Sequence, residues 1–297
     1  MNKRRFGVDW DATVKKIDEQ NDTKAKYKDE RVYYPERNKD GTGGALIRFI
    51  PSPDTDVPYV NVYSHSCEGP GGYYIQNCPT TLNDPCPACN HNRKIWNENE
   101  EETARKLTKN TKRKLSYYSN ILVVNDPKNP ENNGKVFLFR YGVKIYDKIM
   151  EVWRPKNEIS KSIPVFDYYD GANFELIINA KKVGKITMPN YDASKFETPT
   201  AVGTDDEIEK IHGTRYSLAE YVTPEKFKPF AELEERFQKS QGVVGVTHAP
   251  AKSTPSPVDE VKEAVAVAVA ETTTDEGKTE EMFDGDDDAF FNSLQND

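Results

Sequence analysis

Short hydrophobic runs, separated by glycine, proline and asparagine, divide the chain into segments of strand length. Residues 45–50 (ALIRFI) lie between a glycine-rich turn and Pro51, which predicts the first strand of a folded core. Residues 59–63 form a second strand-like run that leads into a group of cysteines, and residues 117–124 form a third.

Alternation of side chains predicts two further strands. Phe137, Phe139 and Tyr141 fall on one face of a strand-like run, because successive side chains of a strand point to opposite sides. Residues 173–179 predict another strand, followed by a lysine-rich hairpin tip at residues 181–185. Several short strands with long insertions and few helices predict a mainly β fold with some α, closer to a small barrel than to a parallel sheet.

Helical patterns are weaker than the strand patterns. Trp10, Val14 and Ile17 recur at helical spacing after a basic N-terminus, which predicts a short amphipathic helix. Residues 95–107 are helical in composition. Order is expected to end near residues 242–245, because proline, threonine, alanine and acidic residues dominate from there.

Charge is distributed unevenly along the chain. The 297 residues carry a net charge of −8, but residues 255–297 contain 13 acidic residues and two lysines, a net charge of −11. Residues 1–254 therefore carry a net charge of +3. A mildly basic body with a strongly acidic tail indicates an interaction segment or a competitor for a basic surface. We expect a basic arm over residues 1–20, a core over 21–254 and a disordered acidic tail over 255–297.

The distribution of apolar residues and cysteines indicates the compartment. The longest apolar run, residues 264–270, is too short to cross a bilayer, and the N-terminus lacks the apolar stretch of a secretory signal. We therefore expect an intracellular protein with no membrane partner. A disulfide framework in a chain this long normally spreads its bridges, whereas the four cysteines here lie in one short window and indicate a metal site. They are Cys67, Cys78, Cys86 and Cys89.

The CPAC loop of residues 86–89 is the strongest local signal. Its two thiolates can bind one metal ion, with Cys78 eight residues upstream. Tetrahedral zinc needs a fourth ligand, and either His65 or Cys67 can supply it, because residues two apart on a strand point to the same side. His91 is a weaker candidate, since it continues into the predicted helix. The pattern predicts one bound Zn²⁺.

The same loop matches one half of the zinc deaminase signature, P-C-x-x-C. The other half requires a glutamate two residues after the ligand histidine, and Cys67 stands at that position after His65. Four available protein ligands also describe a closed site with no position for a reactive water. The pattern therefore favours a structural zinc over a catalytic one.

Aromatic residues alternate with positive charge in three segments. Single-stranded nucleic acid needs both groups, because cations pair with phosphates while exposed rings stack on unpaired bases. For any one tyrosine, core packing is an equal alternative, but the recurrence of the pattern supports a binding surface. The predicted residues are Lys112, Arg113, Lys114, Tyr117, Tyr118, Phe139, Arg140, Tyr141, Lys144, Tyr146 and Tyr191, with Lys181, Lys182 and Lys185 preceding the last of them.

Several motifs follow one another in a fixed order along the chain. They are the strand at residues 46–49, the set His65, Cys78, Cys86 and Cys89, and the segments 112–124, 130–137, 147–149, 171–174 and 190–196. In this order they resemble the single-stranded DNA-binding, helix-destabilising proteins of T-even-like bacteriophages. The resemblance covers nearly the whole order of parts.

The resemblance implies a particular core. It implies an oligonucleotide-binding (OB) fold, a five-stranded barrel, with an inserted zinc subdomain near residues 60–115. The implied zinc ligands are His65, Cys78, Cys86 and Cys89. It also implies an aromatic-lined cleft, in which Tyr73, Tyr118 and Tyr146 stand where the family has tryptophans.

The resemblance further implies a function without catalysis. The protein would bind single-stranded DNA (ssDNA) cooperatively and without sequence specificity, and would coat and protect it during phage DNA replication, recombination and repair. It would act at replication forks in the cytoplasm of the infected host cell. The alternatives are a deaminase-like zinc enzyme of nucleic acid and a zinc-stapled scaffold.

The resemblance assigns the two ends of the chain to interactions. Lys3, Arg4 and Arg5 would serve head-to-tail self-association, although Phe6 and Gly7 follow where the family has Ser-Thr. The tail would recruit replication and recombination proteins such as polymerase, helicase loader, primase and recombination mediator. Its expected contact residues are Asp286, Asp287, Asp288, Phe290, Phe291 and Leu294.

Overall fold

The computed structural model describes residues 29–157, 159–183 and 186–243. The basic arm with the expected Trp10 helix, the acidic tail and Lys185 therefore lie outside the described residues. Within the described ranges, no helix combines the length and the apolar character needed to cross a bilayer.

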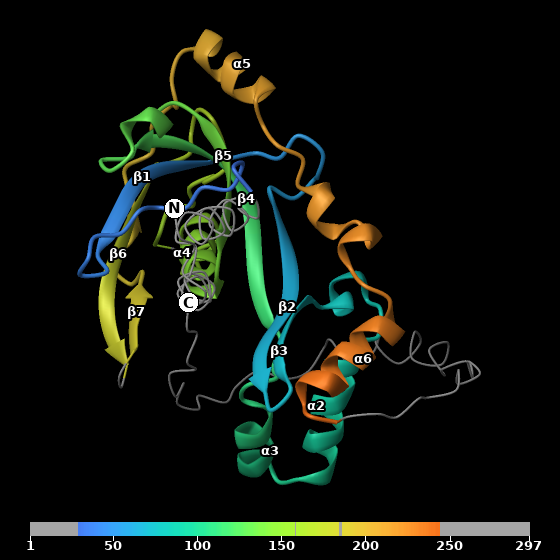
Figure 1. Cartoon of the computed structure of the whole chain (residues 1–297). Helices are drawn as coiled ribbons and strands as arrows, with labels where there is room; N and C mark the ends of the chain where they lie inside the picture. Colours follow the sequence, from blue (N-terminus) through green and yellow to red (C-terminus); the bar gives the residue numbers. More distant parts are fainter. Residues whose placement is uncertain (1–28, 158, 184–185, 244–297) are drawn as a thin grey trace, which may run out of the picture.

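An antiparallel sheet forms the body of the described structure (Figure 1). Its eight strands follow the order β3-β2-β4-β1-β6-β7, with β5 paired to β4 and β8 paired to β6. The strands are β1 (Gly43–Ile50), β2 (Tyr59–Gly69), β3 (Gly72–Asn77), β4 (Lys114–Asn125), β5 (Val136–Tyr141), β6 (Phe174–Val183), β7 (Ile186–Asn190) and β8 (Lys195–Phe196). The predicted mainly β class with some α is confirmed.

The long strand β4 connects the two ends of the body. β2 pairs with its first half and β1 with its second half, so that Tyr59 lies opposite Ser119 and Ile50 lies opposite Asn120. β5 pairs with the middle of β4 at the same time and therefore occupies its other edge. β1 and β2 thus lie end to end along one edge of β4.

The predicted strands are confirmed, and several are longer than expected. β2 continues to Gly69, beyond the expected end at Tyr63, because β3 pairs with it from Ser64 onward. This extension places His65 and Cys67 on a strand. The hairpin β2–β3 is part of the segment that was expected to bind metal.

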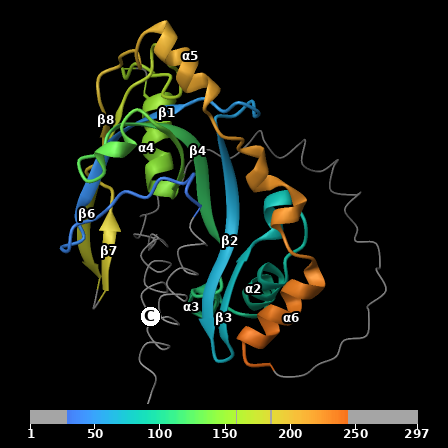
Figure 2. The same ribbon diagram turned by 45° about the horizontal axis from the view of Figure 1, so that its top comes forward.

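The described helices lie at three places around the sheet. α2, α3 and α6 gather beside the β2–β3 hairpin, α4 lies against β4, and α5 lies at the opposite end of the molecule (Figures 1 and 2). They are α2 (Pro87–Glu98), α3 (Glu101–Thr108), α4 (Val143–Trp153), α5 (Asp205–Gly213) and α6 (Phe230–Ser240).

The helix expected over residues 95–107 is wrong in its bounds. α2 already begins at Pro87, since proline is preorganised for the first turn of a helix and has no N–H to leave unpaired there. It ends at Glu98, and Asn99 adopts an extended conformation before α3 begins at Glu101. The second half of the CPAC loop therefore lies in the first turn of α2.

A large aromatic core fills one face of the sheet. Phe137, Phe139 and Tyr141 share a face of β5, as predicted, and pack into this core. Phe49 from β1 lies with its ring centroid 5.6 Å from that of Tyr141. Burial of several aromatic side chains contributes the largest apolar areas of any residues, so this cluster is the main stabilising core.

The five-stranded barrel is not confirmed by the strand pairings. β5 is paired with β4, and within the described residues no pairing joins β5 to β6. The pairings therefore establish a large antiparallel sheet without closing it.

Candidate metal centre and nucleic-acid interface

Four of the predicted metal ligands lie together beside the β2–β3 hairpin. Their ligand atoms, from His65, Cys78, Cys86 and Cys89, all lie within 4.8 Å of one another. His65 lies on β2, and Cys78 directly follows β3. Cys86 is the N-cap of α2, and Cys89 lies in the first turn of that helix. Strand, turn and helix N-terminus thus converge on one point.

The distances within this ligand group suit tetrahedral zinc. His65 Nε2 lies 3.4 Å from the Sγ atoms of both Cys86 and Cys89, and the Sγ atoms of Cys78 and Cys89 are 3.6 Å apart. Zinc bonded at about 2.3 Å to sulfur and about 2.1 Å to nitrogen separates two sulfurs by about 3.8 Å and a nitrogen from a sulfur by about 3.6 Å. The donor set therefore fits this ion.

A buried hydrogen bond fixes the tautomer of His65. Its Nδ1 lies 2.9 Å from the carbonyl oxygen of Thr111, and a carbonyl can only accept a hydrogen bond. Nδ1 therefore carries a proton, and Nε2, which faces the cysteines, is the nitrogen that can bind a metal ion. Metal-binding histidines characteristically donate their second N–H to such a partner.

The electrostatics of the ligand group favour binding of a cation. Hydrogen bonds from Cys86 and Cys89 hold the pKa of the Cys78 thiol far below its usual range. Burial lowers the pKa of His65, but contacts with Cys78 and Cys86 outweigh it and raise that pKa to about 9. The pKa of the Cys89 thiol moves in the opposite direction, above its usual range, because of its hydrogen bonds with Cys78 and Cys86. The buried thiols therefore compete for negative charge, and a metal ion would allow them to ionise together.

The structure separates the alternative ligands from this group. Cys67 is buried, and its Sγ lies 3.9 Å from the carbonyl oxygen of Tyr74. Burial raises the pKa of its thiol. His91 is exposed on α2, with its ring centroid 5.2 Å from that of Phe237. Of the candidates for the fourth position, His65 is the one brought together with the cysteines.

The predicted basic cluster lies next to the ligand group. Arg113 donates a hydrogen bond to the hydroxyl of Thr80 at 2.7 Å, and this hydroxyl lies 3.1 Å from Cys78 Sγ. The Arg113 guanidinium also lies over the ring of Tyr63, 4.0 Å from its centroid. Lys112 is exposed. The cluster is therefore positioned by the elements that hold the ligands.

Strand alternation divides the predicted DNA-binding residues between two faces of the sheet. Tyr117 lies opposite Tyr141, and both face the aromatic core. Tyr118 lies opposite Arg140 on the other face. Lys114 shares the face of Tyr118, because it lies four positions earlier on β4.

Three of the predicted stacking residues belong to the core. Tyr117, Phe139 and Tyr141 are only 7%, 4% and 3% exposed. The ring of Tyr117 stacks on that of Tyr146 at a centroid distance of 4.0 Å and an interplanar angle of 4°. The structure thus gives these three rings the alternative role, core packing, because neighbouring side chains cover the faces that a base would need.

Other predicted residues lie around this core. Tyr146 and Tyr191 are half-buried and pack against it, while Lys144 is exposed and lies 3.6 Å from a carboxylate oxygen of Asp192. Lys181 and Lys182 are exposed on β6. Tyr73 is exposed on β3, away from the core face.

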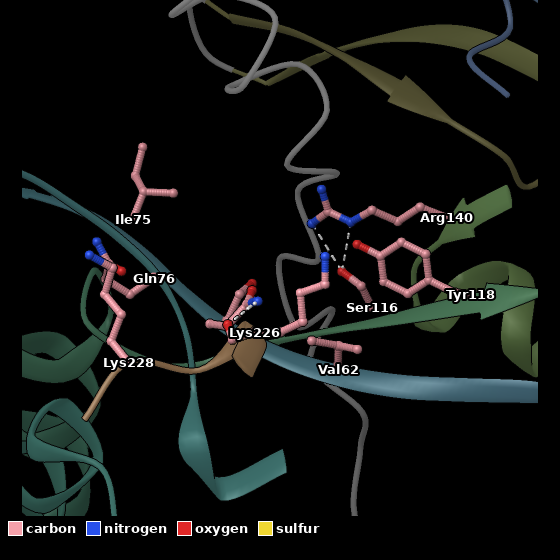
Figure 3. A pocket seen from close by; sticks show the side chains of 10 residues that line it. Val62, Ile75, Gln76, Ser116, Tyr118, Arg140, Lys226 and Lys228 are labelled. Carbon is pink, nitrogen blue, oxygen red and sulfur yellow. Dashed lines mark hydrogen bonds between the residues drawn. The ribbon is translucent and has the colours of Figure 1, made fainter. Parts of the chain in front are cut away.

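A groove of about 360 Å³ lies on the face that carries Tyr118 and Arg140 (Figure 3). One wall is the sheet, and the other is the connecting segment, residues 214–229, which runs beside β2 from α5 to α6 (Figure 2). Lys226 and Lys228 of this segment line the groove. Sequence reasoning missed these two lysines, although Phe227 lies between them and provides the same combination of aromatic and basic residues.

The groove has the chemistry of an anion-binding surface. It is lined by the cations Arg140, Lys226 and Lys228, and no carboxylate is among its lining residues. Both Nε and an Nη of Arg140 donate to the Ser116 hydroxyl, at 3.1 and 3.0 Å. Figure 3 shows Arg140 and Lys226 directed toward the same space, with the ring of Tyr118 beside them. Cations and an aromatic ring are therefore combined in one groove.

Together, the sheet, the Cys/His ligand group and the cationic groove define a mainly β protein with a group of residues that could hold a metal ion and a groove suited to an anionic ligand. The sequence profile of a family described as "gp32 DNA binding protein like" matches residues 41–241. The chain is 36% identical over 220 residues to the single-stranded DNA-binding protein of Enterobacteria phage T2, which covers 71% of this chain and 70% of that protein. It is 36% identical over 211 residues to the protein of the same name from Enterobacteria phage T4, covering 68% and 67%. The chain belongs to the gp32 DNA-binding protein family.

Proposed function

We propose that this chain binds single-stranded DNA without catalysing a reaction on it. The observation that carries this proposal is the groove in which Arg140, Lys226 and Lys228 accompany the half-buried ring of Tyr118. Flexible single strands are held by cations on their phosphates and by rings on their bases, which requires little sequence specificity. The names of the T2 and T4 relatives describe the same activity in those proteins.

The alternative functions lack comparable support. A deaminase needs a glutamate two residues after the ligand histidine and a vacant coordination position on the zinc. Here Cys67 stands at the position of that glutamate, and four protein donors converge, which leaves no vacant position. A scaffold gives no reason for a groove with three cations and no lining carboxylate. Membership in a DNA-binding family favours the binding protein over both.

We propose that the ligand group holds one structural zinc ion. His65 would bind through Nε2, and Cys78, Cys86 and Cys89 would bind as thiolates. Bound zinc supplies a crosslink between strand, turn and helix, and the free energy of such binding contributes directly to folding. The protein residues contribute the preformed donor geometry and the hydrogen bond that orients His65.

The proposed DNA contacts centre on the groove face. Tyr73, Lys114, Tyr118 and Arg140 share this face, and Lys112 lies at the start of this strand region. Lys226 and Lys228 join them from the connecting segment. For Arg113, Lys144, Tyr146 and Tyr191 we propose a role at the edges of the binding surface, whereas Tyr117, Phe139 and Tyr141 are assigned to the core.

We also propose that the sheet is an OB-type barrel, supported by the shared long strand β4 and by the aromatic core enclosed between β1, β5 and β6. The zinc subdomain would span about residues 60–115 of a core over 21–254. The basic arm, residues 1–20, would mediate cooperative self-association. The acidic tail, residues 255–297, would recruit replication and recombination proteins. The protein would then act on ssDNA during replication, recombination and repair in the infected cell.

Titration with oligothymidylate tests the proposed function. Anisotropy of a labelled oligonucleotide should rise to saturation at low salt, and charge reversal at Arg140 and Lys226 should weaken binding and flatten its salt dependence. Removal of one phosphate contact should reduce the log-log slope by about 0.7. Reversal of Lys210, an exposed lysine on α5, serves as the matched control. Wild-type protein that shows no saturable binding would refute the proposal.

A further inference from the structure

The segment before the basic cluster is attached to the metal-ligand group by a second residue besides His65. The buried carbonyl of Thr111, which accepts from His65, also accepts a hydrogen bond from Asn92 Nδ2 at 2.9 Å. In return, the Thr111 hydroxyl donates to Asn92 Oδ1 at 2.6 Å. Asn92 lies on α2, whose N-terminus carries two of the ligands. This helix therefore holds Thr111 through both the carbonyl and the hydroxyl of that residue.

The connecting segment is attached to the same region from the other side. Asn77 immediately precedes the ligand Cys78, and its Nδ2 donates to the carbonyl oxygen of Lys226 at 3.1 Å. The Cys78 N–H donates to the carbonyl of Tyr63 at 2.8 Å, which fixes this turn against β2. Asn77 and Lys226 both line the groove. The second cationic wall is thus bonded to the residue next to a ligand.

We propose that Asn92 and Asn77 are positioning residues that transmit the geometry of the metal centre to the cations of the basic cluster and of the groove. Asn92 fixes the start of the segment that carries Lys112 and Lys114, and Asn77 fixes Lys226. The inference deepens the proposed function and rests on it. Its physical basis is preorganisation, because a cation on a fixed backbone loses less conformational entropy when it binds a phosphate.

Asparagine-to-alanine substitutions in the full, zinc-loaded chain test this inference. Asn92→Ala and Asn77→Ala should each weaken binding of labelled oligothymidylate by up to about tenfold, a factor equivalent to about 1.4 kcal/mol and within the range of one lost hydrogen bond. The log-log salt slope should become shallower by about 0.7 for each phosphate that the protein no longer binds. Zinc should stay at one per chain. A lower fraction of folded protein reduces the active concentration and leaves the salt slope unchanged, so the slope distinguishes positioning from stability.

Matched variants make the test specific. Asn99 directly follows α2, and its side chain also donates a hydrogen bond to a carbonyl, that of Ile95. The Asn99→Ala variant should bind ssDNA like the wild type. Thr111→Ser keeps the hydroxyl that reaches Asn92 and should also bind like wild type, whereas Thr111→Val should behave like Asn92→Ala.

Two results would overturn the inference. The first is that Asn92→Ala and Asn77→Ala keep the affinity and salt slope of Asn99→Ala. The second is that their affinity falls only in proportion to the loss of zinc, with the slope unchanged, which would make both residues merely structural. Saturable binding by the wild-type chain in the same titration separates these outcomes from a failure of the proposed function, which would remove the basis of both proposals.

Discussion

Tyr117 and Tyr118 are neighbours in sequence on opposite faces of β4, and they should fail in different ways when truncated. Tyr117 is 7% exposed and stacks on Tyr146 and Tyr141 at centroid distances of 4.0 and 5.6 Å. Tyr118 is half-buried at the groove, stacked on Tyr221 at 4.1 Å. Substitution of each by alanine therefore tests which face meets the DNA.

The expected magnitudes separate the two variants clearly. Truncating a buried aromatic side chain costs about 3 to 5 kcal/mol of folding free energy, so Tyr117→Ala should be strongly destabilised yet still folded if the domain has an ordinary stability of about 5 to 15 kcal/mol. Loss of a stacking ring costs about 1 to 3 kcal/mol per base, so Tyr118→Ala should bind ssDNA about 5- to 150-fold more weakly. Its loss of stability should be smaller, because Tyr118 packs against fewer buried rings.

Urea unfolding followed by circular dichroism gives the stability of each variant. Fluorescence anisotropy with a short labelled oligothymidylate, at a temperature where both variants are folded, gives the affinity. Phenylalanine at position 118 is the control, since it keeps the ring and should bind nearly as well as tyrosine. If folded Tyr117→Ala loses as much affinity as Tyr118→Ala, the assignment of Tyr117 to the core and of the groove to DNA is wrong.

Three further predictions concern the metal, a buried carboxylate and the tail. Cys78→Ser or His65→Ala should leave less than one zinc per chain and lower the melting temperature, whereas Cys67→Ser should keep the zinc. Metal analysis measures the zinc content and calorimetry measures the melting temperature. Loss of zinc from Cys67→Ser but not from His65→Ala would make Cys67 the fourth ligand. Burial raises the pKa of Asp126, but hydrogen bonds from the Asn129 and Lys128 amides, Asn132 and Tyr33 outweigh it and hold that pKa below its usual value. Its stabilisation is therefore fully present above the unfolded pKa of about 3.9 and is lost as the pH falls through the lower folded pKa. Asp126→Asn should lower the free energy of unfolding at pH 7, and by progressively less as the pH falls below about 3.9. Deleting residues 255–297 changes the net charge from −8 to +3 and should speed stopped-flow association with ssDNA at low salt, with the increase shrinking as salt rises; an unchanged rate would exclude self-competition.

Local sequence patterns were sufficient for the strands and for most of the ligand group. Strand length and alternation depend on residues close in sequence, so β1 and β5 could be predicted, along with the shared face of Phe137, Phe139 and Tyr141. The CPAC loop predicts its own chemistry, because two thiolates at that spacing can bind one ion.

The choice between His65 and Cys67 required strand pairing. Both residues lie on the same face of β2, and alternation alone cannot distinguish them. Asn77 pairs with Ser64, so the next residue, Cys78, lies at the level of Tyr63, two positions from His65 and four from Cys67 along β2. Cys67 pairs instead with Tyr74, further along the hairpin. The spacing of the cysteines alone does not reveal this register, because it depends on where the β2–β3 hairpin turns.

The sequence by itself indicated most of the residues that could bind DNA, and the tertiary structure decided which residues face one groove. Charge and aromatic content are properties of single residues, so Tyr117 and Tyr118 look equivalent in the sequence. Their separation onto a buried and a half-exposed face follows from what packs on each side of β4. Lys226 joins Arg140 only because the connecting segment folds back beside β2, and such proximity between distant segments depends on the packing of the whole chain.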